Sequence, residues 1–208
     1  MPRIVVFIDA QNLYQDARRT FFTPADDRTR GQISPRRFGE VLVPVRPGAD
    51  RKLHQVRIYT GRPSSSRDPQ TYGAHMRQCA AWSSQPGVVV VPRSLRYPRN
   101  WPTERAQEKG IDVHLAVDLV RGYVADEFDV GIVASTDTDL VPAIEALFDL
   151  DKRRGFDPVE VCAWKSKSES KQIRLIGREL WCTDLLAHHY NRAADPTDYN
   201  VRRPLPKR

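Results

Sequence analysis

Arg3-Ile-Val-Val-Phe-Ile-Asp9 is the stretch that most constrains the fold of this chain of 208 residues. Its continuous apolar run is rich in β-branched residues and has no helical period, which is typical of a strand buried on both faces. An aspartate ends the run, and residues 12–22 then have the character of a helix. The stretch therefore predicts the first strand and the first helix of an α/β domain.

Further apolar runs along the chain predict more strands, over residues 54–60, 87–91, 129–134 and 158–163. Helical stretches are predicted between them, over residues 69–82, 111–120 and 139–148. Residues 23–35 and 92–108 are polar connections. Because short apolar strands that alternate with helices form parallel sheets with right-handed crossovers, we predict a Rossmann-like sheet of about five parallel strands with helices on both faces.

The composition is that of a basic globular protein. Charged residues make up 28% of the chain, and the formal net charge is +7. This excess of Lys and Arg favours a polyanionic partner, because these side chains replace the counterions of phosphates. The cysteines, Cys79, Cys162 and Cys182, form neither a disulfide framework nor a zinc-binding pattern. No apolar run approaches the roughly 20 residues that a membrane helix needs, so we expect a cytoplasmic protein without a membrane partner.

We expect a single α/β domain over residues 1–190, since single cores commonly occupy about 100–200 residues. Residues 191–208 combine prolines with several Lys and Arg. A segment of that composition cannot bury enough apolar surface to fold, so we expect a solvated, disordered tail there.

Acidic residues fall where strands end. Asp9 follows the first predicted strand, and Asp137 and Asp139 follow the strand at 129–134, in Ser135-Thr-Asp-Thr-Asp-Leu140. In an open parallel sheet, ligands bind outside the carboxyl ends of the strands. If these two strands are neighbours, the three carboxylates meet at one edge of the sheet.

Asp112 is the fourth acid of this set. On a helix it shares a largely apolar stripe with Leu115 and Ala116, and a carboxylate on such a face needs a cation or a hydrogen-bonding network. Crowded carboxylates repel one another unless a cation neutralises them. Ligation by oxygen alone suits Mg²⁺ or Mn²⁺, which can activate water for hydrolysis of a phosphodiester. The sequence therefore predicts a divalent cation bound by Asp9, Asp112, Asp137 and Asp139.

Each acid also has a structural alternative. Asp9 could close an Asx turn, and Asp137 or Thr138 could cap the helix that follows. Asp112 could pair with Lys109, one turn earlier on the helix. The joint position of the acids at predicted strand ends favours the metal site over these separate roles.

The connection before Asp112 mixes basic and aromatic side chains, which could follow a phosphate backbone and stack unpaired bases. A plain solvated loop is equally compatible with this composition. The predicted RNA-binding residues are Arg93, Arg96, Tyr97, Arg99, Trp101 and Arg105.

Three blocks of the sequence resemble, in order and in separation, the signature motifs of NYN domains, which belong to the PIN-like nuclease superfamily. The blocks are Phe7-Ile-Asp-Ala-Gln-Asn-Leu13, Lys109-Gly-Ile-Asp-Val113 with Asp118, and Ser135-Thr-Asp-Thr-Asp-Leu140. The resemblance covers roughly residues 3–163. It implies a PIN-like parallel sheet and an endoribonuclease site that depends on Mg²⁺ or Mn²⁺.

The resemblance assigns the catalytic and metal-binding roles to Asp9, Asp112, Asp137 and Asp139. It adds a supporting group, within which Asn12 would orient a ligand or a metal-bound water: Asn12, Lys109, Asp118 and Ser135. The chain departs from the family at Thr136, where a glycine is common, and at Leu140, where an aromatic residue is common.

The main hypothesis is thus a metal-dependent endoribonuclease acting on single-stranded or looped RNA. An unpaired strand can enter a crevice at the strand ends without the opening of a duplex. The alternative is a catalytically silent RNA-binding or regulatory module that retains the fold. A phosphatase of the haloacid dehalogenase type would need a second aspartate two residues after Asp9, where this chain has Gln11. The sequence leaves open whether the chain forms a homodimer.

Overall fold

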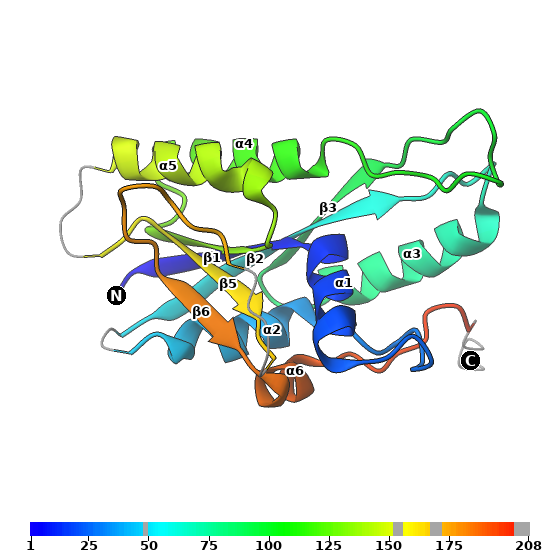
Figure 1. Ribbon diagram of the computed structural model, residues 1–208, viewed down its shortest axis with the longest axis horizontal. Coiled ribbons are helices and arrows are strands. Elements are labelled where there is room, and N and C mark those ends of the chain that lie inside the picture. Colours follow the sequence, from blue (N-terminus) through cyan, green and yellow to red (C-terminus); the bar gives the residue numbers. More distant parts are fainter. Residues whose placement is uncertain (48–49, 152–155, 167–171, 202–208) are drawn as a thin grey trace.

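The structure is a computed structural model, and it describes residues 1–47, 50–151, 156–166 and 172–201. A parallel sheet runs through the middle of the molecule (Figure 1). Its strands lie in the order β3-β2-β1-β4-β5-β6, which makes β1 a central strand. The strands are β1 (Arg3–Asp9), β2 (Lys52–Arg62), β3 (Val88–Ser94), β4 (Val130–Ala134), β5 (Val159–Trp164) and β6 (Cys182–Leu185).

Helices cover both faces of this sheet (Figure 1). Two of them, α4 (Ile111–Val124) and α5 (Val141–Leu150), pack on one face. The opposite face carries α1 (Ala10–Phe21), α2 (Pro35–Leu42), α3 (Pro69–Ser83) and α6 (Ala187–Ala193). Short 3₁₀ turns, η1 (Val43–Val45) and η2 (Thr138–Leu140), precede β2 and α5. The predicted α/β fold with a parallel sheet covered on both faces is confirmed.

The first strand is buried on both faces, as its composition predicts. Ile4, Val6 and Ile8 belong to the core under α1, α2 and α3, whereas Val5 and Phe7 belong to the core under α4 and α5. All five side chains are fully buried. Because successive side chains of a strand point to opposite faces, one uninterrupted apolar run supplies both cores.

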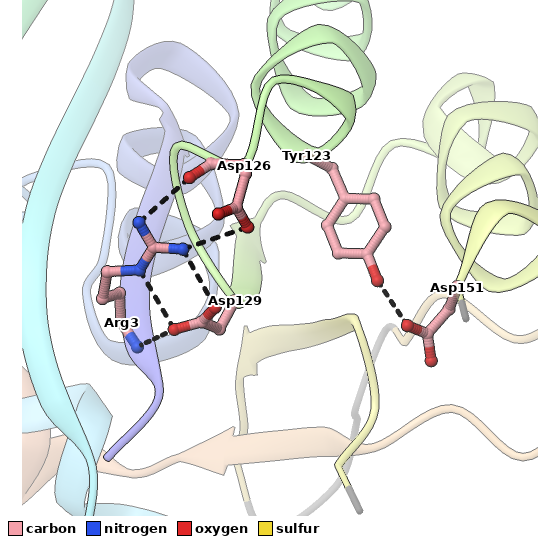
Figure 2. Close-up of polar contacts among 5 residues, drawn as sticks. All are labelled: Arg3, Tyr123, Asp126, Asp129 and Asp151. Atoms are coloured by element: carbon pink, nitrogen blue, oxygen red, sulfur yellow. Dashed lines mark hydrogen bonds and ion pairs between the residues drawn. The ribbon is translucent and has the colours of Figure 1, made fainter. Parts of the chain in front are cut away.

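At the amino end of β1, Arg3 forms hydrogen bonds with Asp129, in the segment that precedes β4 (Figure 2). Its guanidinium lies 3.1 Å from Asp129 through both Nε and Nη2 and also reaches Asp126, while its backbone N–H donates to Asp129 at 2.7 Å. Tyr123 of α4 donates to Asp151 after α5, which ties these two helices together. These contacts lie at the opposite end of the strands from Asp9.

The predicted elements do not include β6 or α2. The sixth strand, β6, has only four residues, Cys-Thr-Asp-Leu, and so short a polar stretch has no recognisable period. The helix α2 spans eight residues and contains Gly39, which weakens its helical signal. Gly39 is nevertheless needed where α2 crosses β2, because an added Cβ would lie 2.9 Å from side-chain carbons of Leu53 and Val56.

The expected tail at residues 191–208 differs from what the structure contains. Residue 191 lies inside α6, and Asp195 is buried. The backbone N–H of Ser34 donates to the Ala193 carbonyl at 2.8 Å, and that of Asp195 donates to the Gln32 carbonyl at 3.0 Å. The segment up to Val201 therefore packs against the domain, because its backbone pairs with the loop before α2. Residues 202–208 lie outside the described part of the chain.

Candidate active site at the carboxyl edge of the sheet

The topology brings the first and third sequence blocks together. Strands β1 and β4 are hydrogen-bonded neighbours, with Ile8 opposite Ala134. Beyond these strands, Asn12 Oδ1 accepts hydrogen bonds from the backbone N–H of Thr136 at 3.0 Å and from its hydroxyl at 3.2 Å. The Thr136 hydroxyl also lies 2.6 Å from Asp16. Asp9 and Asp137 therefore leave adjacent strands through loops that are bonded to each other.

Thr136 has a clear role at the position where the resemblance to NYN domains predicts a glycine. Its hydroxyl lies within hydrogen-bond distance of both Asn12 Oδ1 and Asp16 Oδ2, and its one proton can be donated to either oxygen, which glycine could not do. Thr136 does not have a positive φ, since Asp126 is the one non-glycine residue with a positive φ within the described residues. A threonine at position 136 therefore causes no backbone strain. The departure from the family pattern leaves the turn intact.

Asp9 lies at the end of β1 and begins α1. Its Oδ1 accepts the backbone N–H of Asn12 at 3.0 Å, so Asp9 caps the helix, a structural role close to the Asx turn expected as the alternative, in which Asn12 was the capping residue. The side chain is also buried, with 7% of the residue exposed. Burial, together with the charges of Asp137 and Asp112, raises the pKa of Asp9 to about 6, against the hydrogen bonds from the backbone amides of Asn12 and Gln11. Capping and proximity to other acids therefore coexist at this residue.

Asp137 and Asp139 lie in the tight turn between β4 and α5. Asp137 Oδ1 accepts the backbone N–H of Asp139 at 3.0 Å, and buried Ser135 accepts the backbone N–H of Asp137 at 3.2 Å. Asp137 is half-buried, whereas Asp139 is exposed. Ser135 thus holds the loop that carries Asp137, and Asp137 in turn begins the 3₁₀ turn η2.

Asp112 lies in the first turn of α4, which starts after Gly110. Gly110 has a φ of 72°, a left-handed conformation that glycine adopts without the steric cost of a side chain. This turn brings the half-buried Asp112 near the strand ends, where its charge acts on both Asp9 and Glu108. Among the residues that the structure describes, no ion pair joins Asp112 to Lys109.

Glu108 is a further acid at this edge of the sheet, and it was not among the predicted residues. Its Oε1 accepts the backbone N–H of Gly61, at the end of β2, at 2.9 Å. The Gln11 amide, in the orientation that satisfies its neighbours, donates to both carboxylate oxygens at 2.9 and 3.1 Å. Burial, together with the charges of Asp9 and Asp112, raises the pKa of Glu108 to about 7, against the hydrogen bond from Gly61. The one signal for it was its place directly before the Lys109-Gly-Ile-Asp block.

The remaining residues predicted to support the site, Asp118 and Lys109, bond to other parts of the fold. Asp118 accepts the Tyr59 hydroxyl at 3.0 Å and pairs with Arg121 and His114, one helical turn away on α4. The side chain of Lys109 is exposed. Its carbonyl accepts Arg93 Nε at 3.0 Å, which fastens the start of α4 to β3. These contacts stabilise the scaffold around the acids.

The donor set suits a hard divalent cation, because it consists of carboxylate oxygens whose like charges oppose the ionisation of Asp9. No Lys or Arg within the described ranges forms an ion pair with Asp9, Asp112, Asp137 or Asp139. Their side chains are nevertheless not gathered tightly: the described part of the chain contains no group of three or more His, Cys, Asp or Glu placed to hold a metal ion. The chemistry of the donors fits a cation, and their present positions do not form a closed cage.

Among the predicted RNA-binding residues, Arg93 lies near the end of β3 and the others lie between β3 and α4, in a segment that is more ordered than a plain solvated loop. Arg96 forms an antiparallel bridge with Gln107, and the rings of Tyr97 and Trp101 meet edge to face at 4.8 Å. Tyr97 also accepts the Ser64 backbone N–H at 2.9 Å. The guanidinium side chains reach solvent, since these four residues are exposed: Arg93, Arg96, Arg99 and Arg105.

The described residues contain no helix with the length and apolar character that a membrane span requires. Comparison with curated proteins finds no match. Among solved structures, the chain is similar to a crystal structure of a protein of unknown function from Vibrio parahaemolyticus, with 15% identity, a TM-score of 0.45, and coverage of 78% of this chain and 80% of that one.

The family comparison is more decisive. The family model of the NYN domain matches residues 3–174, which include all three sequence blocks and five of the six strands. The match continues past β4, which the last of the three blocks follows, and includes β5. The chain therefore belongs to the NYN domain family, whose members are generally nucleases.

Proposed function

We propose that this chain is a metal-dependent endoribonuclease that hydrolyses phosphodiester bonds in single-stranded or looped RNA. The observation that carries the proposal is the buried carboxyl of Asp9 at the end of central strand β1. The like charges of Asp137 and Asp112 act on it, and the charge of Asp9 acts in turn on Glu108. A buried acid at the carboxyl edge of a parallel sheet, whose ionisation is opposed by the charges of other acids, is costly to fold and is typical of a catalytic site.

Two further observations support RNA as the substrate. The formal net charge of +7 favours a polyanion, and the exposed guanidinium groups of the segment before α4 can contact phosphates. Membership of the NYN family supports hydrolysis of a nucleic acid. A non-catalytic RNA-binding module would have little need for a buried acid whose ionisation is opposed by the charges of neighbouring acids.

Asp9, Asp112, Asp137 and Asp139 would hold Mg²⁺ or Mn²⁺, which when bound supplies Lewis-acid stabilisation of the charge that develops on the phosphodiester oxygens. Asn12 and Ser135 keep the two acid-bearing loops in register through their bonds to Thr136 and Asp137. Glu108 has a pKa of about 7, so its carboxylate can accept or release a proton near neutral pH.

The decisive experiment incubates the purified chain with a labelled RNA that contains both stem and loop, with Mg²⁺ or Mn²⁺ and with EDTA. An Asp9→Asn, Asp137→Asn double variant is assayed beside an Asp149→Asn control, whose side chain is exposed and paired with Arg178. We expect metal-dependent cleavage in unpaired regions by the wild type and the control and none by the double variant. Since Asn keeps an oxygen that can cap α1, loss of cleavage should not reflect loss of the fold.

The outcomes separate the two functional classes. Cleavage that persists at full rate in EDTA would exclude a metal-dependent mechanism. If the wild type binds the RNA but never cleaves it, with any metal tested, the chain is a binding module and the proposed activity is wrong.

A further inference from the structure

A cavity of about 800 Å³ lies next to the candidate active site. Its walls come from α1, the loop at residues 24–33, the end of β2, α3 and residues 198–200. Gln11, Gly61 and Glu108 form part of the wall, so the cavity adjoins the acids through the Glu108 carboxylate. The proposed reaction at the acids does not use this cavity.

The C-terminal segment closes one side of the cavity. After α6 the chain runs back beneath α1 towards α3 (Figure 1). The Arg77 guanidinium of α3 donates to the Tyr199 carbonyl at 2.8 Å, and the Tyr199 hydroxyl bonds Asp195 at 2.7 Å. These bonds hold residues 198–200 against the body of the domain, so that the wall is a built part of the fold.

The charge of the cavity wall excludes a phosphate as its natural occupant. The charged side chains among its lining residues are four carboxylates, Asp26, Asp27, Glu108 and Asp198, and one guanidinium, Arg28. A phosphate would be repelled by this surface, whereas an uncharged group with N–H donors would be attracted to it. The basic residues that suit phosphates lie outside, between β3 and α4.

The rest of the wall suits a flat heteroaromatic ring. Tyr14, His75 and Trp82 line the cavity together with side-chain amides such as that of Gln78. Burial lowers the pKa of His75, so its ring is neutral at physiological pH. Trp82 is 5% exposed, so only a small part of its ring contributes to the wall. Apolar and aromatic walls with a few side-chain amides are typical of pockets for small polar rings.

We infer that this cavity receives the nucleobase of the nucleotide next to the phosphate that is cleaved. The inference rests on the proposed function, because it takes RNA as the substrate. The volume of the cavity lies within the range of about 300–1,000 Å³ that is usual for ligand pockets. A base can enter only if it is unpaired, because a base within a duplex is already stacked and paired. The cavity would therefore restrict the enzyme to single-stranded or looped RNA.

The test measures binding without metal, so that it does not depend on cleavage. A labelled single-stranded oligoribonucleotide is compared with an abasic ribose-phosphate strand of equal length and charge, by fluorescence anisotropy in EDTA. We expect the wild type to bind the strand with bases at least about tenfold more tightly, since base stacking on aromatic side chains contributes this much or more.

Matched substitutions on α3 assign that preference to the cavity. Ala74 lines the cavity and Ala80 is exposed outside it, so Ala74→Phe should abolish the preference for bases while Ala80→Phe retains it. If Ala74→Phe fails to fold, Gln78→Leu and the exposed control Gln70→Leu provide a milder pair of the same kind. We expect Gln78→Leu alone to reduce the preference for the strand with bases by at least about fivefold.

The results distinguish this inference from the proposed function. Equal binding of both strands by the wild type, or an undiminished preference in the folded cavity variants, would overturn the inference even if the chain cleaves RNA. A preference that the cavity variants abolish would support base binding in the cavity, even in a chain that proves unable to cleave.

Discussion

Asn12 Oδ1 accepts both the backbone N–H and the hydroxyl of Thr136, at 3.0 and 3.2 Å, and so joins the first turn of α1 to the loop after β4. The two residues are 124 positions apart in the chain. The bond therefore sets the spacing between the loops that carry Asp9 and Asp137.

Replacing Asn12 by alanine should loosen this junction. Asn12→Ala leaves the part-buried N–H of Thr136 without its acceptor, and we expect the free energy of unfolding to fall by about 1–2 kcal/mol. Urea denaturation measures the change. Asn100→Ala is the matched control, because Asn100 is an exposed loop residue whose side chain donates to the exposed Glu104. Equal stability of the two variants would contradict a linking role for Asn12.

The stability of the metal-free protein should depend on pH through Asp9. Its pKa is raised from 3.8 to about 6 in the folded state, so the folded protein binds more protons than the unfolded chain between these values. The stabilisation from the protonated carboxyl is present at low pH and is lost as the pH rises through about 6. Asp9→Asn should thus gain stability relative to wild type by on the order of 2 kcal/mol between pH 4.5 and pH 8. Denaturation in EDTA measures this difference, and a difference that does not vary with pH would rule out the electrostatic cause.

A bound divalent cation should offset the loss of stability that the ionised carboxylate of Asp9 causes. If Asp9, Asp112, Asp137 and Asp139 bind Mn²⁺, the ion stabilises the folded state by about 2.7 kcal/mol when its concentration is 100 times its dissociation constant. The melting temperature of the wild type should rise with Mn²⁺, and that of the Asp9→Asn, Asp137→Asn variant should not. Asp149→Asn should respond as the wild type does. A similar rise in all three proteins would indicate a cation site elsewhere.

The position of Glu108 should depend on the absence of a side chain at Gly61. A Cβ there would lie 2.5 Å from Glu108 Oε1 and 2.4 Å from Leu95 Cδ2, so Gly61→Ala must displace the carboxylate towards solvent. The pKa of Glu108 should then fall from about 7 towards its ordinary value of 4.5. Carbon NMR titration of the Glu108 carboxyl measures this. In the control Gly73→Ala, where the nearest atom is a flexible Arg77 nitrogen at 3.3 Å, the titration should not change.

At the other end of β1, Arg3 should contribute to stability without affecting the site. Its guanidinium meets Asp129 and Asp126 while 40% of the Arg3 side chain is exposed, so we expect Arg3→Met to cost about 1 kcal/mol. The affinity for Mn²⁺, measured by calorimetry, should equal that of the wild type. A change in affinity would show that the two ends of the strand are coupled.

Much of the fold could be predicted from local patterns. The run Ile4–Ile8 identified a strand buried on both faces, and the alternation of such runs with helices identified a covered parallel sheet. The patterns failed at α2 and β6, which are short and carry little periodicity, and at residues 191–201, whose composition resembles a tail. These elements are stable because of what they pack against, and a local window of sequence does not contain that information.

The strand ends that carry Asp9 and Asp137, and the family of the three blocks, could be identified from local sequence. Three relationships could not: β1 and β4 are neighbours, Asp118 of α4 bonds Tyr59 of β2, and Glu108 meets Gly61 and Gln11. Burial and proximity are properties of the packed chain, so no local pattern encodes them. Glu108 belongs to a polar connection with no period, and it becomes an acid with a raised pKa only where three distant segments enclose it.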